Sequence, residues 1–238
     1  MDSPATCERE PRILALWERG VGLGRWARED SFIVANGPPP SALGARNAAL
    51  LRLRASLFDR VWPLCSRCPA CAADCEFVAD CVALADQVNA DAVPGRTAHV
   101  DHSGRSIALR APTVHDLHDI AVLSDVHEAA RALLRRCMAD GGTLNELDDD
   151  AVADLSAQLE RLDPGAVVSF ALHCPDCGHD WSAAIDVGDA LWRELQRAAE
   201  QTLIEVDALA RAYGWTEREV LGLSPVRRAA YLQLAGAA

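Results

Sequence analysis

Two short cysteine motifs in this 238-residue sequence have the composition and spacing of metal ligands. The first is CPAC, with Cys68 and Cys71, and the second is CPDC, with Cys174 and Cys177. A tight turn of this kind presents two thiolates, and two such turns supply the four thiolates of a closed tetrahedral zinc site. The spacing therefore predicts one structural Zn²⁺ with four ligands: Cys68, Cys71, Cys174 and Cys177.

The two motifs belong to a weak internal repeat. Aligned without gaps, CPACAADCEFVAD (68–80) and CPDCGHDWSAAID (174–186) share Cys-Pro-x-Cys and two later aspartates. Each motif precedes a strand-like stretch, as in a zinc knuckle. The long segment between the motifs must carry its own structure. Because the entropy of loop closure grows only slowly with loop length, this separation does not prevent a shared site.

Additional cysteines crowd the first knuckle and leave its ligand set open. Cys65 and Cys68 also have ligand spacing, and Cys75 is close enough in sequence to replace a knuckle cysteine. Cys65 and Cys75 are therefore alternative ligands, since only the matching CPxC form favours Cys68 and Cys71. The remaining cysteines are interpreted as small buried apolar residues: Cys7, Cys81 and Cys137.

The CPxC motifs also resemble those of thiol oxidoreductases, in which a lowered thiol pKa drives disulfide exchange. Such a motif normally begins a helix, whereas Cys177 is followed by Gly-His-Asp-Trp and a strand pattern. A closed four-cysteine site has no coordination position for water, so it implies no metal catalysis. Without a Ser-His-Asp grouping, a phosphate-binding loop or a dinucleotide fingerprint, we expect the protein not to be an enzyme.

The histidines are interpreted without a metal ion. His115 and His118 lie one helical turn apart in HDLHD, a group more typical of a solvated helix face than of a metal site. His173 and His179 flank the second knuckle, and we interpret them as its neighbours rather than its ligands.

Composition and charge narrow the possible partners. The formal net charge of −12 argues against a general nucleic-acid binder, which needs a basic surface to displace counterions.

The nine cysteines are odd in number, which favours metal ligands and free thiols in a reducing compartment. The sequence has neither an apolar run long enough for a membrane span nor an apolar signal core, so we expect a cytoplasmic protein.

The elements that position the knuckles are expected to be mainly helical, because aromatic residues are few and Ala and Leu form helices well. Residues 12–35 predict a helical arm with glycine interruptions, and NGPPPS, 36–41, predicts a break. Ser41 is the expected N-cap of a helix over 42–61, with Arg52 and Arg54 turned away from its apolar face.

Between the knuckles, the sequence predicts a β-hairpin over 96–113, with its turn at 102–105. One or two helices follow over 113–138, with Thr113 and Ser124 as candidate caps, and then an amphipathic helix over 148–163 and a strand over 166–173.

After the second knuckle, an apolar stripe predicts one long helix that ends near Gly214. A capping box at 216–219 and the pair Ser224-Pro225 predict two further short helices. These helices superficially resemble a DNA-binding helix-turn-helix, but the second of them offers only Arg218, and Arg227 and Arg228 come later. A helical hairpin that packs within the protein or docks to a partner is favoured.

Together these patterns predict an α+β, mainly helical fold. Its expected centre is a split zinc ribbon, formed by two CPxC knuckles with short strands and interrupted by an insertion of a hairpin and helices. Three segments are expected: an N-terminal arm with the Pro-rich break (1–40), the first helix with the split ribbon and its insertion (41–187), and the C-terminal helical hairpin (188–238).

Four segments in this order resemble a family of small zinc-ribbon proteins from the baseplates of contractile phage tails and related extracellular contractile injection systems. They are LGARNAALLRLRASLFD before the first knuckle, ALRAPTVHDL, ALHCPDCGHDW and ALARAYGWTEREVLGLSPVRRAAYLQL. The resemblance covers most of residues 43–235. The chain departs from the family pattern in the first knuckle, where Ala72 replaces the usual glycine and three extra cysteines occur.

The resemblance implies a non-enzymatic assembly component that binds other baseplate, hub or spike proteins and can become part of a tail-like particle. Trp192, Trp215 and Tyr231 are candidate anchors for such a partner, although each is also a typical core residue. Two alternatives from other classes are kept: a zinc-ribbon transcription regulator that binds DNA, and a CPxC thiol oxidoreductase.

Overall fold

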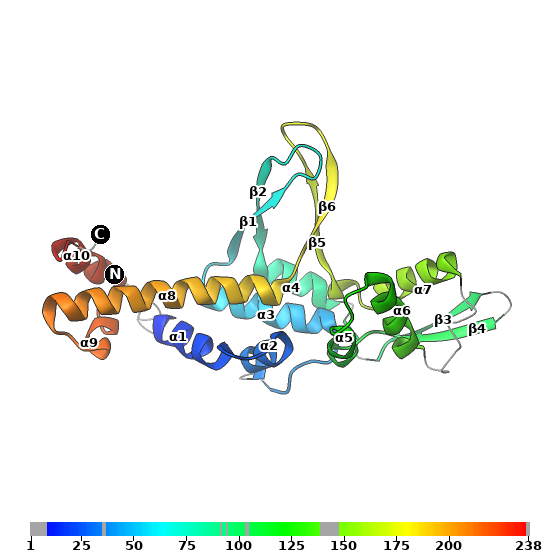
Figure 1. Cartoon of the computed structure of the whole chain (residues 1–238), viewed down its shortest axis with the longest axis horizontal. Helices are drawn as coiled ribbons and strands as arrows, with labels where there is room; N and C mark the ends of the chain where they lie inside the picture. Colours follow the sequence, from blue (N-terminus) through cyan, green and yellow to red (C-terminus); the bar gives the residue numbers. More distant parts are fainter. Residues whose placement is uncertain are drawn as a thin grey trace. The chain divides into compact units, whose positions relative to one another are not determined.

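Helices and small antiparallel sheets build the described part of the chain, which confirms the prediction of a mixed, largely helical fold (Figure 1). The computed structural model describes residues 9–34, 37–90, 92–93, 95–102, 105–138 and 148–236. The chain divides into two units, one from the segments up to Phe32 and from Gly188 onward, and the other from Ile33–Val187. Segments from the predicted arm and the predicted C-terminal hairpin thus share the first unit.

Two β-hairpins in the second unit carry the CPxC motifs in their loops. Strand β1 (Val61–Arg67) pairs with β2 (Asp74–Asp80), and β5 (Val168–His173) pairs with β6 (Asp180–Ile185). The hairpins lie side by side with their loops at the same end (Figure 1), and the rings of Phe77 and Phe170 meet with centroids 5.1 Å apart. Because a lone two-stranded hairpin is marginally stable in water, each hairpin depends on its contacts with the other.

Helices α3 (Leu43–Leu57) and α4 (Cys81–Ala90) support the first hairpin, since β1 follows α3 closely and α4 begins where β2 ends. Arg52 is exposed and pairs with Asp86 at 2.7 Å, as its predicted outward position requires. The same prediction is wrong for Arg54, which is buried. Its Nη1 donates to the Asp59 carbonyl at 2.7 Å, and its guanidinium lies 4.9 Å from the centre of the Trp62 ring.

The N-terminus of α3 is capped from far along the chain. Ala42, rather than Ser41, occupies the N-cap position, and no N-cap side chain caps the helix. Instead, the Gly44 amide donates to Oδ2 of Asp163 at 3.0 Å. Asp163 immediately precedes the short 3-10 helix η4 (Pro164–Ala166), and a Cβ at Gly165 would lie 2.2 Å from the Val88 carbonyl oxygen. The predicted Ser41 cap is therefore wrong, and the junction between α3, α4 and η4 requires close backbone packing.

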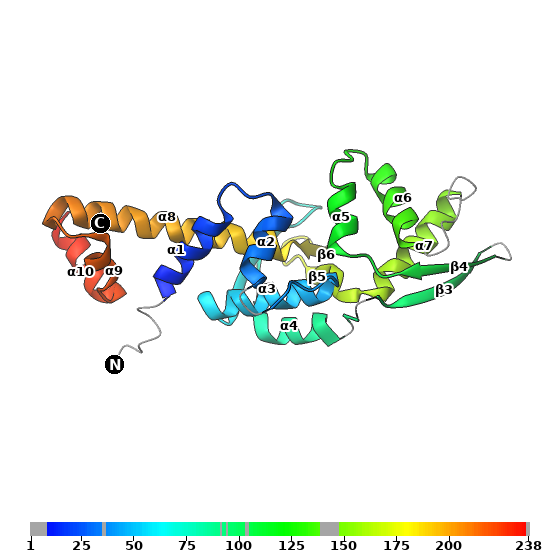
Figure 2. The same cartoon turned by 90° about the horizontal axis from the view of Figure 1, so that it is seen from below.

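The segment between the hairpins folds as the predicted hairpin and helices, with α5, α6 and α7 on one side of the β3–β4 hairpin (Figure 2). The elements are β3 (Thr97–His102), β4 (Arg105–Arg110), α5 (Val114–Ile120), α6 (Val126–Cys137) and α7 (Asp149–Leu162). Buried Leu109, Leu134 and Leu155 contribute to its core. Thr113 caps α5 as predicted, whereas Asp125 rather than Ser124 caps α6. The central turn residues 103–104 lie outside the described chain.

The first unit combines α1 (Arg9–Gly20) and α2 (Arg25–Ile33) with α8 (Val187–Tyr213), α9 (Glu217–Leu221) and α10 (Pro225–Leu234). The apolar stripe of α8 is buried at Leu191, Leu195 and Leu209. The predicted capping box at Thr216 and the N-cap at Ser224 are both present. In Figure 2, α9 and α10 lie near the end of α8, which agrees with the predicted helical hairpin.

Candidate metal centre

The two knuckle loops have the same backbone hydrogen bonds at equivalent positions. In the first, the Cys68 amide donates to the Ala73 carbonyl at 2.8 Å, and the Ala72 amide donates to the Cys68 carbonyl at 2.9 Å. In the second, the amides of Cys174 and Gly178 make the corresponding bonds, each at 2.9 Å. The internal repeat seen in the sequence is thus a structural repeat.

These loops bring the sulfur atoms of four cysteines within 4.8 Å of one another: Cys68, Cys71, Cys174 and Cys177. Across the two loops, the sulfurs of Cys68 and Cys177 are 3.7 Å apart, and those of Cys71 and Cys174 are 3.6 Å apart. A zinc ion with Zn–S bonds of about 2.3 Å at the centre of a regular tetrahedron requires sulfur separations of about 3.8 Å. The cluster therefore has the size that a tetrahedral metal ion needs.

The cluster has a buried side and an exposed side. Cys68 and Cys174 are 1% and 0% exposed, whereas Cys71 and Cys177 are exposed. Trp181 packs beside the buried pair. Two ligands are therefore held in the core between the hairpins, and two face solvent.

The sulfur atoms differ strongly in acidity. Backbone amides, first that of Cys177 and also that of Asp176, donate to the Cys174 sulfur and lower its pKa to about 6. The Ala73 amide lowers the pKa of Cys71, but hydrogen bonds with Cys177 and Cys174 outweigh it and raise that pKa to about 12. Four neighbouring thiolates repel one another, so a cation is required to keep all four deprotonated together.

The alternative ligands occupy other positions. Cys65 is exposed on β1, opposite Glu76, and Cys75 is buried on β2 beside the cluster. Neither belongs to the group of four. Cys81 and Cys137 are buried, in agreement with their interpretation as apolar residues, and Cys7 lies outside the described chain.

Neighbouring histidines do not join the cluster. His173 Nδ1 lies 2.8 Å from Oδ1 of Asp180, and the His179 ring stacks on Trp181 with centroids 6.4 Å apart. Four sulfur ligands complete a tetrahedron and leave no position for a water molecule, so the arrangement suits a structural ion rather than a catalytic one. Each CPxC motif lies between two antiparallel strands, and neither begins a helix.

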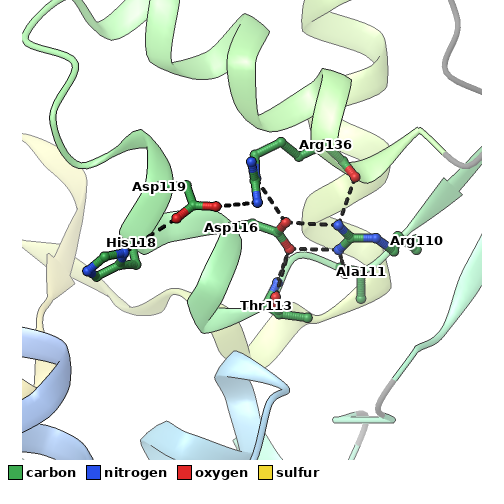
Figure 3. Close-up of polar contacts among 7 residues, drawn as sticks. All are labelled: Arg110, Ala111, Thr113, Asp116, His118, Asp119 and Arg136. Atoms are coloured by element: carbon green, nitrogen blue, oxygen red, sulfur yellow. Dashed lines mark hydrogen bonds and ion pairs between the residues drawn. The ribbon is translucent and has the colours of Figure 1, made fainter.

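The sequence-based interpretation of a second polar group, the one around Asp116, is wrong. Asp116, interpreted as part of a solvated helix face, is only 2% exposed. Its carboxylate accepts two hydrogen bonds from Arg110, at 2.7 and 2.8 Å, and one from Arg136 at 3.2 Å (Figure 3). It also accepts from the amide and hydroxyl of Thr113. Both oxygens of the Asp116 carboxylate accept hydrogen bonds from residues of the fold. Asp116 therefore links β4, α5 and α6 and has no free position for a ligand.

The candidate partner anchors make contacts within the first unit. Trp192 stacks on Phe32 with centroids 6.1 Å apart, and the Arg28 guanidinium lies 4.7 Å from its ring. Trp215 and Tyr231 meet edge to face at 4.8 Å, and both contact Tyr213. Trp192, Trp215 and Tyr231 are all half-buried.

Of the three arginines in the last two helices, Arg228 is paired within the fold, whereas Arg218 and Arg227 are exposed. Arg228 is 3% exposed, and its guanidinium pairs with Glu10 and Glu205, each at 2.6 Å. These contacts join α10 to α1 and α8. Arg228 is therefore not available to contact a phosphate.

Comparisons with protein-family models, curated proteins and solved structures find no match for this chain. No helix in the described part of the chain combines the length and apolar character that a membrane span requires.

Proposed function

We propose that the protein is a non-enzymatic assembly component, a zinc-stapled scaffold that binds other proteins of a phage-tail baseplate or contractile injection system. The observation that carries this proposal is the cluster of four cysteine sulfurs, contributed equally by two knuckles far apart in the sequence. A closed site of this kind stabilises a fold and offers no coordination position for a substrate.

Zinc is the ion that fits this donor set best, because a tetrahedral group of four thiolates selects zinc or iron over harder cations. Cys68 and Cys71 would hold it from the first hairpin, and Cys174 and Cys177 from the second. The bound ion would neutralise the thiolates and fasten β1–β2 to β5–β6. It would thereby fix both ends of the segment that contains α5, α6 and α7.

The partner class rests on the resemblance of four segments to zinc-ribbon baseplate proteins. The structure adds one point against the DNA-binding alternative, because Arg228 is buried and paired with two glutamates. The oxidoreductase alternative has the low pKa of Cys174 in its favour, but that sulfur is fully buried and an attacking thiolate must reach its substrate.

Metal analysis of the purified chain tests the staple. We expect about one zinc ion per chain in the wild-type protein, and in Cys174→Ser we expect loss of the ion together with the ordered packing of the two hairpins. Cys65→Ser is the matched control, since Cys65 is an exposed knuckle-strand cysteine outside the cluster, and it should keep the ion. A metal-free, folded wild-type protein with a reactive thiol would favour the oxidoreductase instead.

Affinity purification of the tagged chain from cells that produce tail-like particles tests the partner class. Recovery of baseplate, hub or spike proteins is the expected result. If DNA fragments are recovered in their place, with affinity that falls steeply as salt rises, the transcription regulator is the better description. Failure to recover any tail protein would contradict the proposed assembly role.

A further inference from the structure

The proposed zinc site uses four cysteines, but a fifth is packed against it. Cys75 on β2 is 8% exposed and shares a small core cluster with the two buried ligands, Cys68 and Cys174. Ala73 and Trp181 pack against the same cluster. Cys75 therefore places a fifth sulfur in the same buried cluster as two of the metal ligands.

The sulfur tetrahedron has an inner edge and an outer edge. Cys68 and Cys174 form the inner edge in the core, and Cys71 and Cys177 form the outer edge in solvent. Cys75 contacts the inner edge. Reagents that modify thiols reach the outer edge first, whereas Cys75 is protected from them.

We propose that Cys75 is a reserve ligand, which completes the coordination of the ion when the outer thiolate of Cys71 is lost. This inference rests on the proposed zinc site. Cys71 is the ligand to be replaced because it belongs to the same loop and lies four residues before Cys75. When Cys71 is alkylated by iodoacetamide, its thiolate forms a carbon–sulfur bond, iodide leaves and the neutral thioether no longer binds the ion. The Cys75 thiol then gives up its proton to solvent and binds the ion in its place. The ion therefore keeps four thiolates and the same total charge.

Cys65 cannot serve in the same way. It lies on the neighbouring strand opposite Glu76, whereas Cys75 lies opposite Ser66. Because side chains alternate along a strand, Cys65 points to the face opposite that of Cys75. Cys65 is exposed there, on the side away from the metal ligands. It is thus the natural control for a change at Cys75.

Cobalt(II) absorption of the full-length chain tests the exchange, because the intensity of sulfur-to-cobalt charge transfer follows the number of thiolates bound. We expect four-thiolate spectra from the wild-type protein and from Cys71→Ser. The double variant Cys71→Ser/Cys75→Ser should show a weaker spectrum and bind cobalt about 10-fold or more weakly than Cys71→Ser. The control, Cys71→Ser/Cys65→Ser, should match Cys71→Ser.

A second measurement avoids any folding defect of Cys71→Ser. Folded, zinc-loaded wild-type protein is treated with iodoacetamide and examined by native mass spectrometry and peptide mapping. Molecules alkylated at Cys71 should still hold one zinc ion, and the same modification of Cys75→Ser should release it.

Two results would overturn the inference. One is a three-thiolate cobalt spectrum in Cys71→Ser that is unchanged by Cys75→Ser, and the other is release of zinc from wild-type protein as soon as Cys71 is alkylated. In both cases the four-cysteine site and the proposed function would stand. A wild-type chain that binds neither cobalt nor zinc would instead overturn the proposed function together with this inference.

Discussion

Each knuckle turns through one residue in the left-handed region of backbone conformation, and the two residues differ in type. Gly178 has a φ of 72°, and Ala72, at the equivalent position, has a φ of 63°. Glycine adopts this conformation without strain, whereas a Cβ raises its energy by about 1–2 kcal/mol. The first knuckle therefore holds a strained residue where the second does not, and the fold tolerates it beside the metal ligands.

This strain predicts that Ala72→Gly stabilises the protein. Relief of the strain exceeds the added flexibility of glycine in the unfolded chain, so the free energy of unfolding should rise by about 0.5–1 kcal/mol. Gly178→Ala should lower it by about 1–2 kcal/mol, because open space surrounds that position and only the backbone opposes a Cβ. Urea denaturation of the metal-loaded proteins measures both.

Ala70→Gly is the control for these changes. Ala70 is exposed in the same loop and has an ordinary negative φ, so glycine should not stabilise the protein there. Equal effects of Ala70→Gly and Ala72→Gly would show that the left-handed conformation of Ala72 is not strained.

The contacts of Asp116 predict that the stability of the protein depends on pH. Burial alone would raise the pKa of this carboxyl, but hydrogen bonds from Arg110 and Thr113 outweigh it and hold the pKa well below its ordinary value. The stabilisation is therefore fully present above the ordinary value near 4, and it is lost as the pH falls below it. At pH 7, Asp116→Asn should lower the free energy of unfolding by about 2–3 kcal/mol, since Arg110 and Arg136 remain accessible to water.

The measurement is urea denaturation of wild type and Asp116→Asn between pH 7 and pH 3. The difference between the two proteins should narrow below about pH 4, because the Asp116 carboxyl of the unfolded wild-type chain takes up a proton there while the folded carboxylate stays ionised. A difference that stays constant over this range would mean that the ion pairs do not supply the stabilisation.

At the scale of elements, Asp163 at the N-terminus of α3 has a raised pKa, in contrast to the lowered pKa of Asp116. Its Oδ2 accepts from Gly44, but Oδ1 is buried without a hydrogen-bond partner. Burial raises the pKa of this carboxyl, against the smaller effect of the Gly44 and Leu43 amides. A raised pKa in the folded state means that the contribution of Asp163 to stability is greatest at low pH and falls as the pH rises through the folded value.

Asp163→Asn should remove this pH dependence, because an amide can still accept from Gly44 but does not titrate. Between pH 4 and pH 7, we expect the variant to gain stability relative to the wild type as the pH rises. Asp163→Ala, which leaves the Gly44 amide without its acceptor, should instead cost about 1–2 kcal/mol at pH 7. Parallel pH profiles of wild type and Asp163→Asn would contradict the predicted titration.

Elements that are stabilised by residues close in sequence were predictable, and an element stabilised by a distant residue was not. The knuckles, the β3–β4 hairpin and the caps at Thr113, Thr216 and Ser224 all depend on residues a few positions apart, and each was predictable. The cap of α3 was not, because Ser41 has the right type and place while the actual acceptor, Asp163, comes from 119 residues away. Arg54 and Asp116 were misplaced for a different reason. Their partners Asp59 and Arg110 are only five and six residues away, but a pattern of apolar spacing does not show that ionisable side chains turn inward to meet such partners.

At the scale of the whole molecule, the metal cluster belongs to one unit, and its removal should act there. Chelation of the ion should increase amide hydrogen exchange in β1, β2, β5 and β6, because the two hairpins lose the link between their loops. Exchange in α1, α2 and the middle of α8 should stay unchanged, since these helices pack in the other unit. Mass spectrometry of exchanged peptides measures this, and restored protection after zinc is added back is the control.

An equal rise in exchange in both units would contradict this local role and would mean that the ion stabilises the whole chain.

The division of the chain into two units could not be predicted from the sequence. Nothing local marks Glu10 as the partner of Arg228, which is 218 residues away, although the hydrogen bonds between them join α1 to α10.

Because the second unit is inserted between two parts of the first, the order of synthesis sets an order of folding. Helices α1 and α2 leave the ribosome first, but α8 emerges only after Ile33–Val187 has been translated, a delay on the order of 10 s. Both knuckles are complete before α8 appears. We therefore expect the inserted unit to fold and take up its ion on the nascent chain before α8 is available to cover the apolar side chains of α1 and α2.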